Sequence, residues 1–385
     1  MSWCGVDRES PLPKLISITL LICSFLPFFG RCGKPTVTWK KVLDTGTDDQ
    51  LAAVLTRGDE VIVAGTQGNQ QQGRTVWFVQ ILDRKGNFVR RQPFAEGSVN
   101  ICRSAALDSA GNLLLAGYAR FYDTTFALIV KVTPEGKTIW KKGIFSGNAC
   151  WANGLAALDS NIVFCGGVQS ASGQEVYLAL LNPAGKTVWT RNYQFDQGAD
   201  AVALAVHPDG NLTVLCRVAS CSGQDMLLMH TKPNGDTLWT RRYDSGGNDL
   251  PAAVGVDRFG NIVGLGTART DDSTRCVVLE YTPDGGAVRK VAYGAAAQAE
   301  AGGLMITEKG AIFISGILIT PKRRKLLVFE YQPNATSVWE HHIDPGFDVQ
   351  SAAIGVDRDV FVAIDGMRQT RDIIVLRLDR PAASR

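Results

Sequence analysis

Residues 239–286 read WTRRYDSGGNDLPAAVGVDRFGNIVGLGTARTDDSTRCVVLEYTPDGG. This stretch contains four short segments of apolar and branched residues, separated by turns rich in Gly, Asn, Asp and Pro. Such turns typically bound β-strands, and no segment shows apolar residues at the helical spacing of three or four. The stretch therefore predicts a four-stranded antiparallel meander.

The same pattern returns along the chain at intervals near 50 residues. The tryptophans that mark it are Trp39, Trp140, Trp189, Trp239 and Trp339, so successive gaps are 49 and 50, or 101 and 100 where one copy lies between. In two copies the tryptophan is replaced, by Phe88-Val89-Arg90 and by Ala287-Val288-Arg289. Seven copies result, and repeats of this length with several strands are typical of propeller blades.

The innermost strand of a propeller blade crowds around the central axis and needs small side chains. The copies supply them at corresponding positions: Ala52-Ala53, Ala105-Ala106, Ala156-Ala157, Ala203, Ala252-Ala253, Gly302-Gly303 and Ala352-Ala353. The segment 36–42 has no inner strands before it, and the last copy has no outer strand after it. We therefore expect an all-β fold: a single seven-bladed β-propeller of four-stranded antiparallel blades over residues 36–385, closed by the N-terminal strand joining the last blade.

Residues 1–35 predict a targeting segment. Residues 15–30 form a run of 16 residues without a charge, flanked by Arg8 and Lys14 before it and by Arg31 and Lys34 after it. This run is short for a membrane-spanning helix and suits the apolar region of a signal peptide. A cleaved signal, a lipoprotein signal ending at Cys32 and an uncleaved anchor all stay open, and each places the chain outside the cytoplasm: periplasmic, at the cell surface or secreted.

The composition excludes a nucleic-acid binder that relies on charge. The chain has 40 Lys and Arg against 37 Asp and Glu, a net charge of +3, and nucleic-acid binders usually carry a clear basic excess. It has only four histidines, no C-x-x-C and no G-x-S-x-G. The sequence therefore predicts no catalytic residues, no metal site and no cofactor, and it does not favour an enzyme.

Two sequence motifs recur at the turns. D-x-x-G-N followed by an apolar residue occurs at 108–118 (DSAGNLLLAGY) and 257–267 (DRFGNIVGLGT), and an apolar residue followed by P-x-G-x-x-x-W occurs at 132–140 and 231–239. With these motifs, residues 36–380 resemble the bacterial β-propeller repeats of the SBBP type. The resemblance implies a propeller of an exported bacterial protein and carries no chemistry.

Acidic or amide residues precede the inner strand in most copies: Asp49, Asn100, Asp200, Asp249, Glu300 and Asp348. Either they form a ring that binds a cation or polar ligand on the axis, or each caps its own turn, which its presence in nearly every copy favours. The D-x-x-G-N segments are interpreted as hairpin turns, since one carboxylate is too few for a calcium loop. Cys216 and Cys221, in CRVASC, are candidates for a local disulfide across a hairpin loop.

Candidate binding residues lie on the face formed by the loops between the second and third strands. Variable loops on a rigid scaffold often carry function, and aromatic and arginine side chains anchor ligands and partners. Arg120, Phe121, Tyr122 and Trp151 stand out on this face.

We therefore expect an exported binding or scaffold module whose long-loop face takes a protein or glycan partner, with no nucleic-acid partner and with membrane contact only through the N-terminal segment. The alternatives are a structural module of a cell-envelope assembly, or a propeller enzyme such as a quinoprotein-like oxidoreductase or a polysaccharide lyase.

Overall fold

The computed structural model describes residues 36–69, 74–195, 197–221, 223–293, 298–331, 339–367 and 370–379. Within these ranges every regular element is a β-strand, which confirms the predicted all-β class. No helix in the described part of the chain is long and apolar enough to cross a membrane. The targeting segment predicted for residues 1–35 lies outside the described residues.

The strands pair antiparallel in groups of four, here numbered as units in chain order, and a single parallel bridge between Ala149 and Thr125 joins units 2 and 3 into one eight-stranded sheet. Unit 1 contains β2 (Asp49–Arg57), β3 (Glu60–Asn69), β4 (Arg74–Asp83) and β5 (Phe88–Phe94). Unit 2 contains β6 (Val99–Leu107), β7 (Leu113–Phe121), β8 (Thr124–Val132) and β9 (Thr138–Ile144). Unit 3 contains β10 (Ala149–Leu158), β11 (Asn161–Ser170), β12 (Gly173–Leu181) and β13 (Thr187–Tyr193). Unit 4 contains β14 (Ala199–Val206), β15 (Leu212–Ser220), β16 (Gly223–Thr231) and β17 (Thr237–Tyr243).

The later units follow the same order. Unit 5 contains β18 (Asn248–Val256), β19 (Ile262–Thr270), β20 (Ser273–Tyr281) and β21 (Ala287–Tyr293). Unit 6 contains β22 (Gln298–Ile306), β23 (Ile312–Ile319), β24 (Arg324–Tyr331) and β25 (Trp339–Ile343). Unit 7 contains β26 (Asp348–Val356), β27 (Val360–Met367) and β28 (Arg371–Leu378), and its fourth strand is β1 (Val37–Leu43), which pairs antiparallel with β28.

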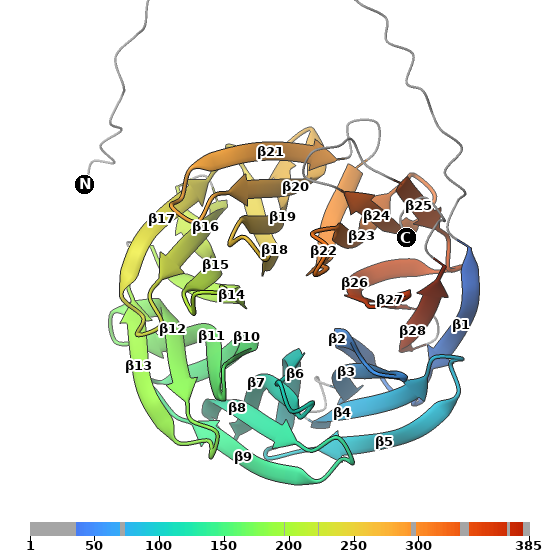
Figure 1. Cartoon of the computed structure of the whole chain (residues 1–385), viewed down its shortest axis with the longest axis horizontal. Helices are drawn as coiled ribbons and strands as arrows, with labels where there is room; N and C mark the ends of the chain where they lie inside the picture. The colour runs from blue at the N-terminus through green and yellow to red at the C-terminus, as the bar shows by residue number, and fades with distance from the viewer. Residues whose placement is uncertain are drawn as a thin grey trace, which may run out of the picture.

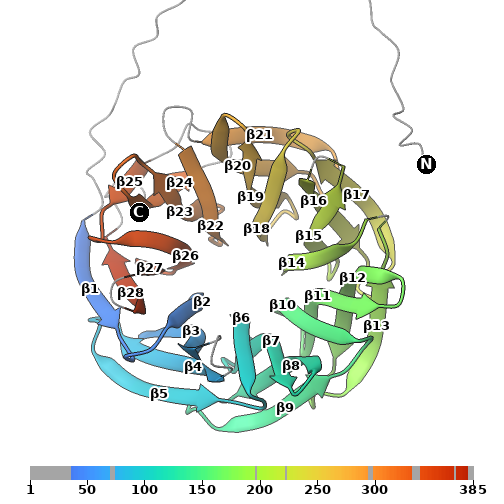
Figure 2. The ribbon, with the colours of Figure 1, turned by 180° about the vertical axis from the view of Figure 1, so that it is seen from behind.

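The units stand radially around a common axis (Figures 1 and 2). The first strand of each unit lies nearest the axis, and the fourth strand lies at the rim. The apolar core lies between neighbouring units: one cluster joins Val163 and Leu178 of unit 3 to Val214 and Leu227 of unit 4. The second and third strands of each unit are therefore apolar on both faces, since each face is covered by a neighbour.

The D-x-x-G-N segments form hairpin turns, as predicted. Asp108 accepts hydrogen bonds from the backbone N–H of Ala110 (3.0 Å) and Asn112 (2.8 Å), and Gly111 has a φ of +76°. Asp257 makes the same contacts in unit 5. The aspartate holds the turn, and the glycine adopts the left-handed backbone that other residues avoid.

Several rim tryptophans connect their unit to the next, whereas Trp339 donates to Glu330 of its own unit. The indole Nε1–H of Trp140 in β9 donates to the Pro183 carbonyl (2.9 Å), and that of Trp239 in β17 donates to the Pro283 carbonyl (3.0 Å). Each indole lies against the glycine of the same turn: a Cβ on Gly185 would lie 2.9 Å from Trp140. The P-x-G turn of one repeat is therefore the docking site for the tryptophan of the preceding repeat.

Arg90 takes over this contact where the tryptophan is missing. Its Nη2 donates to the Pro134 carbonyl of unit 2, the position equivalent to Pro183 and Pro283, and its Nε lies 3.6 Å from where a Cβ on Gly136 would stand. A planar guanidinium supplies both the flat surface and the N–H donor that an indole provides.

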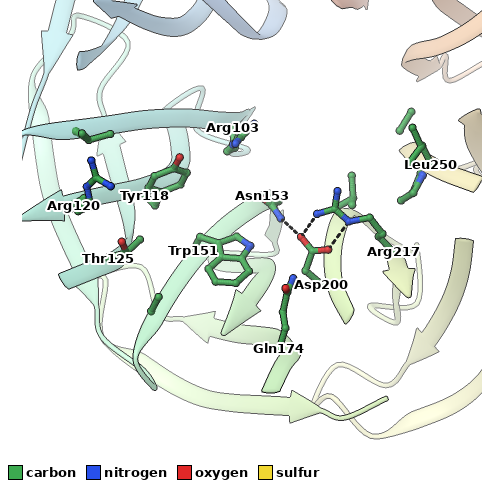
Figure 3. A pocket seen from close by; sticks show the side chains of 15 residues that line it. Arg103, Tyr118, Arg120, Thr125, Trp151, Asn153, Gln174, Asp200, Arg217 and Leu250 are labelled. Carbon is green, nitrogen blue, oxygen red and sulfur yellow. Dashed lines mark hydrogen bonds and ion pairs between the residues drawn. The ribbon is translucent and has the colours of Figure 1, made fainter. Parts of the chain in front are cut away.

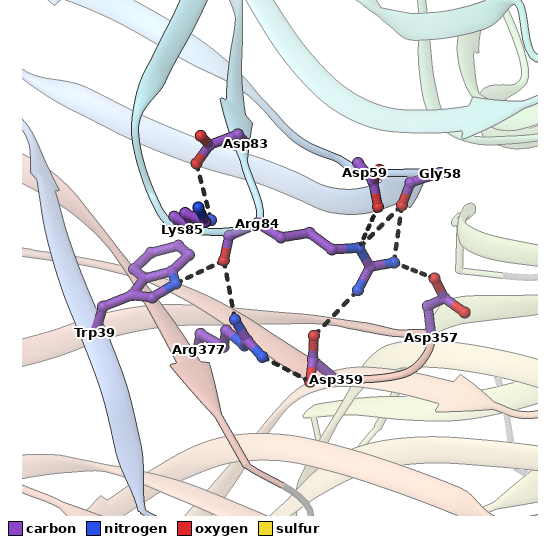
Figure 4. Close-up of polar contacts among 9 residues, drawn as sticks. All are labelled: Trp39, Gly58, Asp59, Asp83, Arg84, Lys85, Asp357, Asp359 and Arg377. Carbon is purple, nitrogen blue, oxygen red and sulfur yellow. Dashed lines mark hydrogen bonds and ion pairs between the residues drawn. The ribbon is translucent and has the colours of Figure 1, made fainter.

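Units 7 and 1 meet through an additional network of charged groups (Figure 4). Arg84 pairs with Asp357, with Asp359 (3.1 Å) and with Asp59 (3.4 Å), and its carbonyl accepts from Nε1 of Trp39 at 2.8 Å. Arg377 donates to Asp359 and to the same Arg84 carbonyl. This network joins residues nearly 300 positions apart in sequence.

The structure corrects the expected disulfide between Cys216 and Cys221, which are not bonded to each other. Strand β15 runs through Ser220, so Cys216 is in mid-strand and Cys221 follows the strand end. Residues five apart along an extended strand are separated by roughly 16 Å, whereas a disulfide needs Cα atoms within about 7 Å. Cys216 is a buried core residue, and Cys221 accepts a hydrogen bond from Nε2 of Gln197.

We predict that Gly185→Ala destabilises the protein more than Gly246→Ala does. Both glycines have a positive φ (+77° and +86°), so both variants pay the left-handed backbone cost of roughly 1–2 kcal/mol. Only Gly185 faces a tryptophan, whereas a Cβ on Gly246 meets nothing within 4 Å. Overpacking should add about 1–3 kcal/mol at Gly185. Denaturant unfolding of both variants measures the difference, and equal losses would show that the contact is unimportant.

Candidate functional site

A cavity of about 1040 Å³ lies at the inner edge of units 2 to 5 (Figure 3). We call it the axial pocket. Its lining comes from the innermost strands β6, β10, β14 and β18, together with β7, β8, β12 and β15. Val99, Thr125, Ala149 and Gln174 lie at strand starts beside the turns between second and third strands. The pocket therefore opens on the face where the sequence predicts ligand binding.

Interruptions in the inner strands bring polar side chains into this pocket. The β6–β7 register shifts between Cys102 and Ser104, and the β10–β11 register shifts between Ala152 and Gly154. The extra residues are Arg103 and Asn153, and both line the pocket. A β-bulge can re-aim a side chain in this way. The corresponding residue is Ala52, Val202 or Ala252 in units 1, 4 and 5, and Gln350 in unit 7, so a polar residue stands at this position in only some of the units.

Asp200 and Arg217 form a two-point ion pair in the wall of the pocket. Nε and Nη2 of Arg217 each donate to a different carboxylate oxygen of Asp200, both at 3.0 Å. Asn153 supports this pair by donating from Nδ2 to Asp200 Oδ2 (3.3 Å) and to the Ala201 carbonyl (2.7 Å). The Asp200 side chain is 3% exposed and that of Arg217 is 40% exposed. The arginine therefore keeps much of its surface available to a ligand.

Two further arginines and two aromatic rings complete the pocket. Arg103 lies over the ring of Tyr118, with 5.8 Å from its Cζ to the ring centroid. Arg120 follows Tyr118 by two residues on β7, on the same face of the strand. Within the described part of the chain, neither Arg103 nor Arg120 forms an ion pair. Three arginines against Asp200 leave this lining with two excess positive charges.

Trp151 lies where it does because β11 provides two glycines. A Cβ on Gly167 would lie 2.3 Å from the Trp151 indole, and one on Gly166 would lie 1.9 Å from the Trp151 carbonyl. Any larger residue at position 167 would displace the ring. The partly exposed indole therefore forms a fixed apolar wall of the pocket.

The structure brings together two of the four binding residues expected from sequence. Arg120 and Trp151 line the axial pocket, whereas Phe121 and Tyr122 do not. Arg120 and Phe121 are the end of β7, and Tyr122 starts the turn that follows. Phe121 (55% exposed) and Tyr122 (83% exposed) pack edge to face with ring centroids 4.7 Å apart. They form a separate aromatic projection on unit 2.

The expected ring of acidic and amide residues is not one set. In unit 4 the register shift follows Ala201, so Asp200 lies one residue before that position. In units 2 and 5 the shift follows Cys102 and Pro251, so Asn100 and Asp249 lie two residues before it and on the opposite face of the strand. Among the six residues of the set, only Asp200 lines the pocket. Asn100 accepts from the N–H of Glu96 and Gly97, and Asp249 accepts from Ser245. The turn-capping interpretation is therefore confirmed for these two.

Asp225, Asp244 and Asp249 bring carboxylate oxygens within 4.8 Å of one another between units 4 and 5. Protein donors already occupy them: Nε of Arg242 donates to Asp225 (2.6 Å), and Gly246 N–H donates to Asp244 (2.7 Å). Burial raises the pKa of Asp249.

The four histidines lie away from the pocket. Thr213 connects His207 and His230, with its Oγ1 2.7 Å from Nε2 of His207 and 3.0 Å from Nδ1 of His230. Burial lowers the pKa of His207 to about 4 and also lowers that of His230. His341 and His342 lie on the rim strand β25. No histidine therefore lines the axial pocket, where it could donate or accept a proton.

Sequence reasoning missed Arg103, Tyr118 and Asn153, and it did not pair Asp200 with Arg217. Arg103 and Asn153 are detectable in principle, because an alignment of the repeats places them opposite Ala52, Val202 and Ala252. The pairing of Asp200 with Arg217 depends on the β14–β15 register, which the turn lengths alone do not give.

No protein-family model matches the chain, and no curated protein matches it. Solved structures do match. An ulvan lyase of polysaccharide lyase family PL25, bound to GlcA(1-4)Rha3S units, has a TM-score of 0.56 at 10% identity, over 87% of this chain and 95% of that one. The polysaccharide lyase Uly1 has a TM-score of 0.53 at 11% identity, over 85% and 89%. The chain has a β-propeller-like fold.

Puromycin hydrolase matches with a TM-score of 0.53 at 13% identity, over 84% of this chain and 51% of that one. This chain therefore spans about half the length of puromycin hydrolase. At these identities the comparisons show the β-propeller-like fold and do not assign an activity.

We predict that Asp49→Asn stabilises the protein above pH 6. Burial raises the pKa of Asp49 from its ordinary value of 3.8 to about 6, and its Oδ2 has no hydrogen-bond partner. The folded state then binds the proton more tightly than the unfolded state, so this carboxyl reduces stability as the pH rises from about 4 to 6. The variant should gain roughly 2 kcal/mol at pH 7, and the gain should vanish below pH 4.

Asn100 provides the matched control, because it is an amide at the corresponding position of unit 2. Its Nδ2 donates to the carbonyls of Thr75 (2.7 Å) and Gly97 (2.8 Å). Asn100→Asp should therefore lose stability at neutral pH. Thermal unfolding between pH 4 and pH 8 tests both variants, and an Asp49→Asn variant with the wild-type pH profile would contradict the prediction.

Proposed function

We propose that this chain is an exported seven-bladed β-propeller, closed by its N-terminal strand, that binds an acidic polysaccharide in the axial pocket. The observation that carries the proposal is the convergence of Arg103, Arg120 and Arg217 with Trp151 and Tyr118 on one cavity. The pairing of β1 with β28 supports the closure. The uncharged run at 15–30 supports export, and the turn motifs support repeats of the SBBP type.

Acidic sugars match this combination of side chains. A guanidinium presents a planar set of N–H donors that fits a carboxylate or a sulfate. The flat apolar face of an indole or phenol ring can cover the C–H face of a sugar ring. The volume of about 1040 Å³ is at the upper end of the range of ligand sites, roughly 300–1,000 Å³. The match to an ulvan lyase bound to a glycan of glucuronic acid and sulfated rhamnose also supports this class of ligand.

We predict that Arg120→Ala and Trp151→Ala each lower the affinity for oligogalacturonate hexasaccharide about tenfold, the equivalent of roughly 1.4 kcal/mol. Calorimetric titration measures this. Added salt should weaken binding, because the arginines are partly exposed. A neutral cello-oligosaccharide of equal length should bind much more weakly.

Arg258→Ala is the matched control for this prediction. Arg258 is an exposed arginine stacked on Phe259 in the β18–β19 turn, at the opposite ends of the strands from the pocket mouth. It should bind the acidic oligosaccharide like the wild type. Equal losses in Arg120→Ala and Arg258→Ala would show that binding follows net charge rather than the pocket.

A polysaccharide lyase is the second candidate, because two lyases match over nearly their whole length and Tyr118 lies beside Arg103. β-Elimination needs a group that neutralises the uronate carboxylate and a group that removes the neighbouring proton. A tyrosine hydroxyl can both accept and donate a proton. We predict that, if the chain is a lyase, ultraviolet-absorbing unsaturated ends accumulate from polygalacturonate and Tyr118→Phe abolishes them while binding persists. If no unsaturated ends form from any polymer in a panel of uronate-containing and sulfated polysaccharides, lyase activity on those polymers is excluded.

A further inference from the structure

A second cavity continues from the axial pocket. It has a volume of about 530 Å³, and we call it the side cleft. It lies between β12 of unit 3 and β14 and β15 of unit 4, and Gln194, Phe195, Gln197 and Gly198 between β13 and β14 also line it. Gln174, Asp200 and Arg217 line both cavities, and Gln174 lies next to Asp200 in Figure 3. The two cavities are therefore neighbouring parts of one groove on the long-loop face.

The chemistry of the side cleft differs from that of the axial pocket. Besides the shared ion pair, its polar lining is dominated by the side chains of Gln174, Gln194, Gln197 and Gln224. Within the described residues, the amides of Gln174, Gln194 and Gln224 make no hydrogen bond to protein. Each amide offers two donors and an acceptor, which suits the adjacent hydroxyl groups of an uncharged sugar.

The side cleft also has apolar lining residues. Phe195 packs partly buried against the core cluster of units 3 and 4. Gly198, with a φ of +90°, Ala199 and Ala219 also line the cleft. An aromatic ring with amides around it can cover one face of a sugar while the amides contact its edges.

We propose that the axial pocket and the side cleft form one continuous site for a linear polysaccharide, in which the arginines hold an acidic sugar and the glutamines hold an uncharged sugar further along the chain. This inference rests on the proposed function and names the ligand: a heteropolymer of acidic and neutral sugars. A peptide lying in the same groove is the competing occupant, and the experiment below separates the two.

The experiment is a titration of the full chain with hyaluronan-derived oligosaccharides, which alternate glucuronate with an uncharged amino sugar. Affinity should increase about tenfold or more from the disaccharide to the hexasaccharide, because only the longer ligand reaches both cavities. The double variant Gln194→Ala/Gln197→Ala should reduce hexasaccharide affinity nearly to that of the disaccharide and leave disaccharide binding unchanged. Gln298→Ala, a glutamine on β22 outside both cavities, is the control and should behave like the wild type.

The outcomes separate this inference from the proposed function. Disaccharide binding that is lost in Arg120→Ala but does not strengthen with length would overturn the extended site and leave the pocket assignment intact. Hexasaccharide binding that the glutamine variant does not change would also overturn it. If no oligosaccharide binds and an acidic peptide library does, both the proposed function and this inference fail.

Discussion

The contact between a rim tryptophan and the glycine of the following unit is the constraint on which the rest of the structure depends. Trp39, Trp140 and Trp239 each donate an indole hydrogen bond to a turn carbonyl of the next unit. The glycine in that turn lets the ring lie flat against the backbone. Each contact joins the outermost strand of one sheet to a turn of the next, so it constrains the spacing between two neighbouring sheets at the rim.

This regular outer frame allows irregularity at the axis. The inner strands carry mostly small residues, and their backbones approach closely: a Cβ on Gly302 would lie 2.8 Å from the Ala352 carbonyl. The register shifts lie in these same strands. An extra residue there changes which side chain faces the axis without moving the tryptophan contacts. The inner strand of every unit has such a register shift, and units 2 and 3 place Arg103 and Asn153 there, so the pocket differs from the other units in its side chains and not in this feature of the backbone.

The strands and their turns could be predicted from sequence because they depend on local chemistry. The turn at Asp108, for example, is held by hydrogen bonds within five residues. Turns of this kind can therefore be recognised from the Gly- and Asn-rich segments that separate the apolar strands. Arg120 and Trp151 were identified for a similar reason, since the sequence alone shows that these large side chains lie beside turns on one face. The predicted Cys216–Cys221 disulfide was wrong because β15 continues to Ser220, so most of the segment that was expected to be a loop is extended strand.

The sequence by itself determined the repeat and the all-β class, because the period and the turn residues are local properties of the chain. Only the tertiary structure decided which residues share the pocket. Asp200 meets Arg217 through the β14–β15 register, and Arg120 meets Trp151 because separate units converge on the axis. The strand register and the meeting of the units at the axis both arise from packing between segments that are far apart in sequence, so they cannot be read from any short stretch of the sequence. Arg90 illustrates the same limit. The sequence shows only that this repeat has no tryptophan, whereas the structure shows that Arg90 makes the hydrogen bond to the turn carbonyl of the next unit in its place.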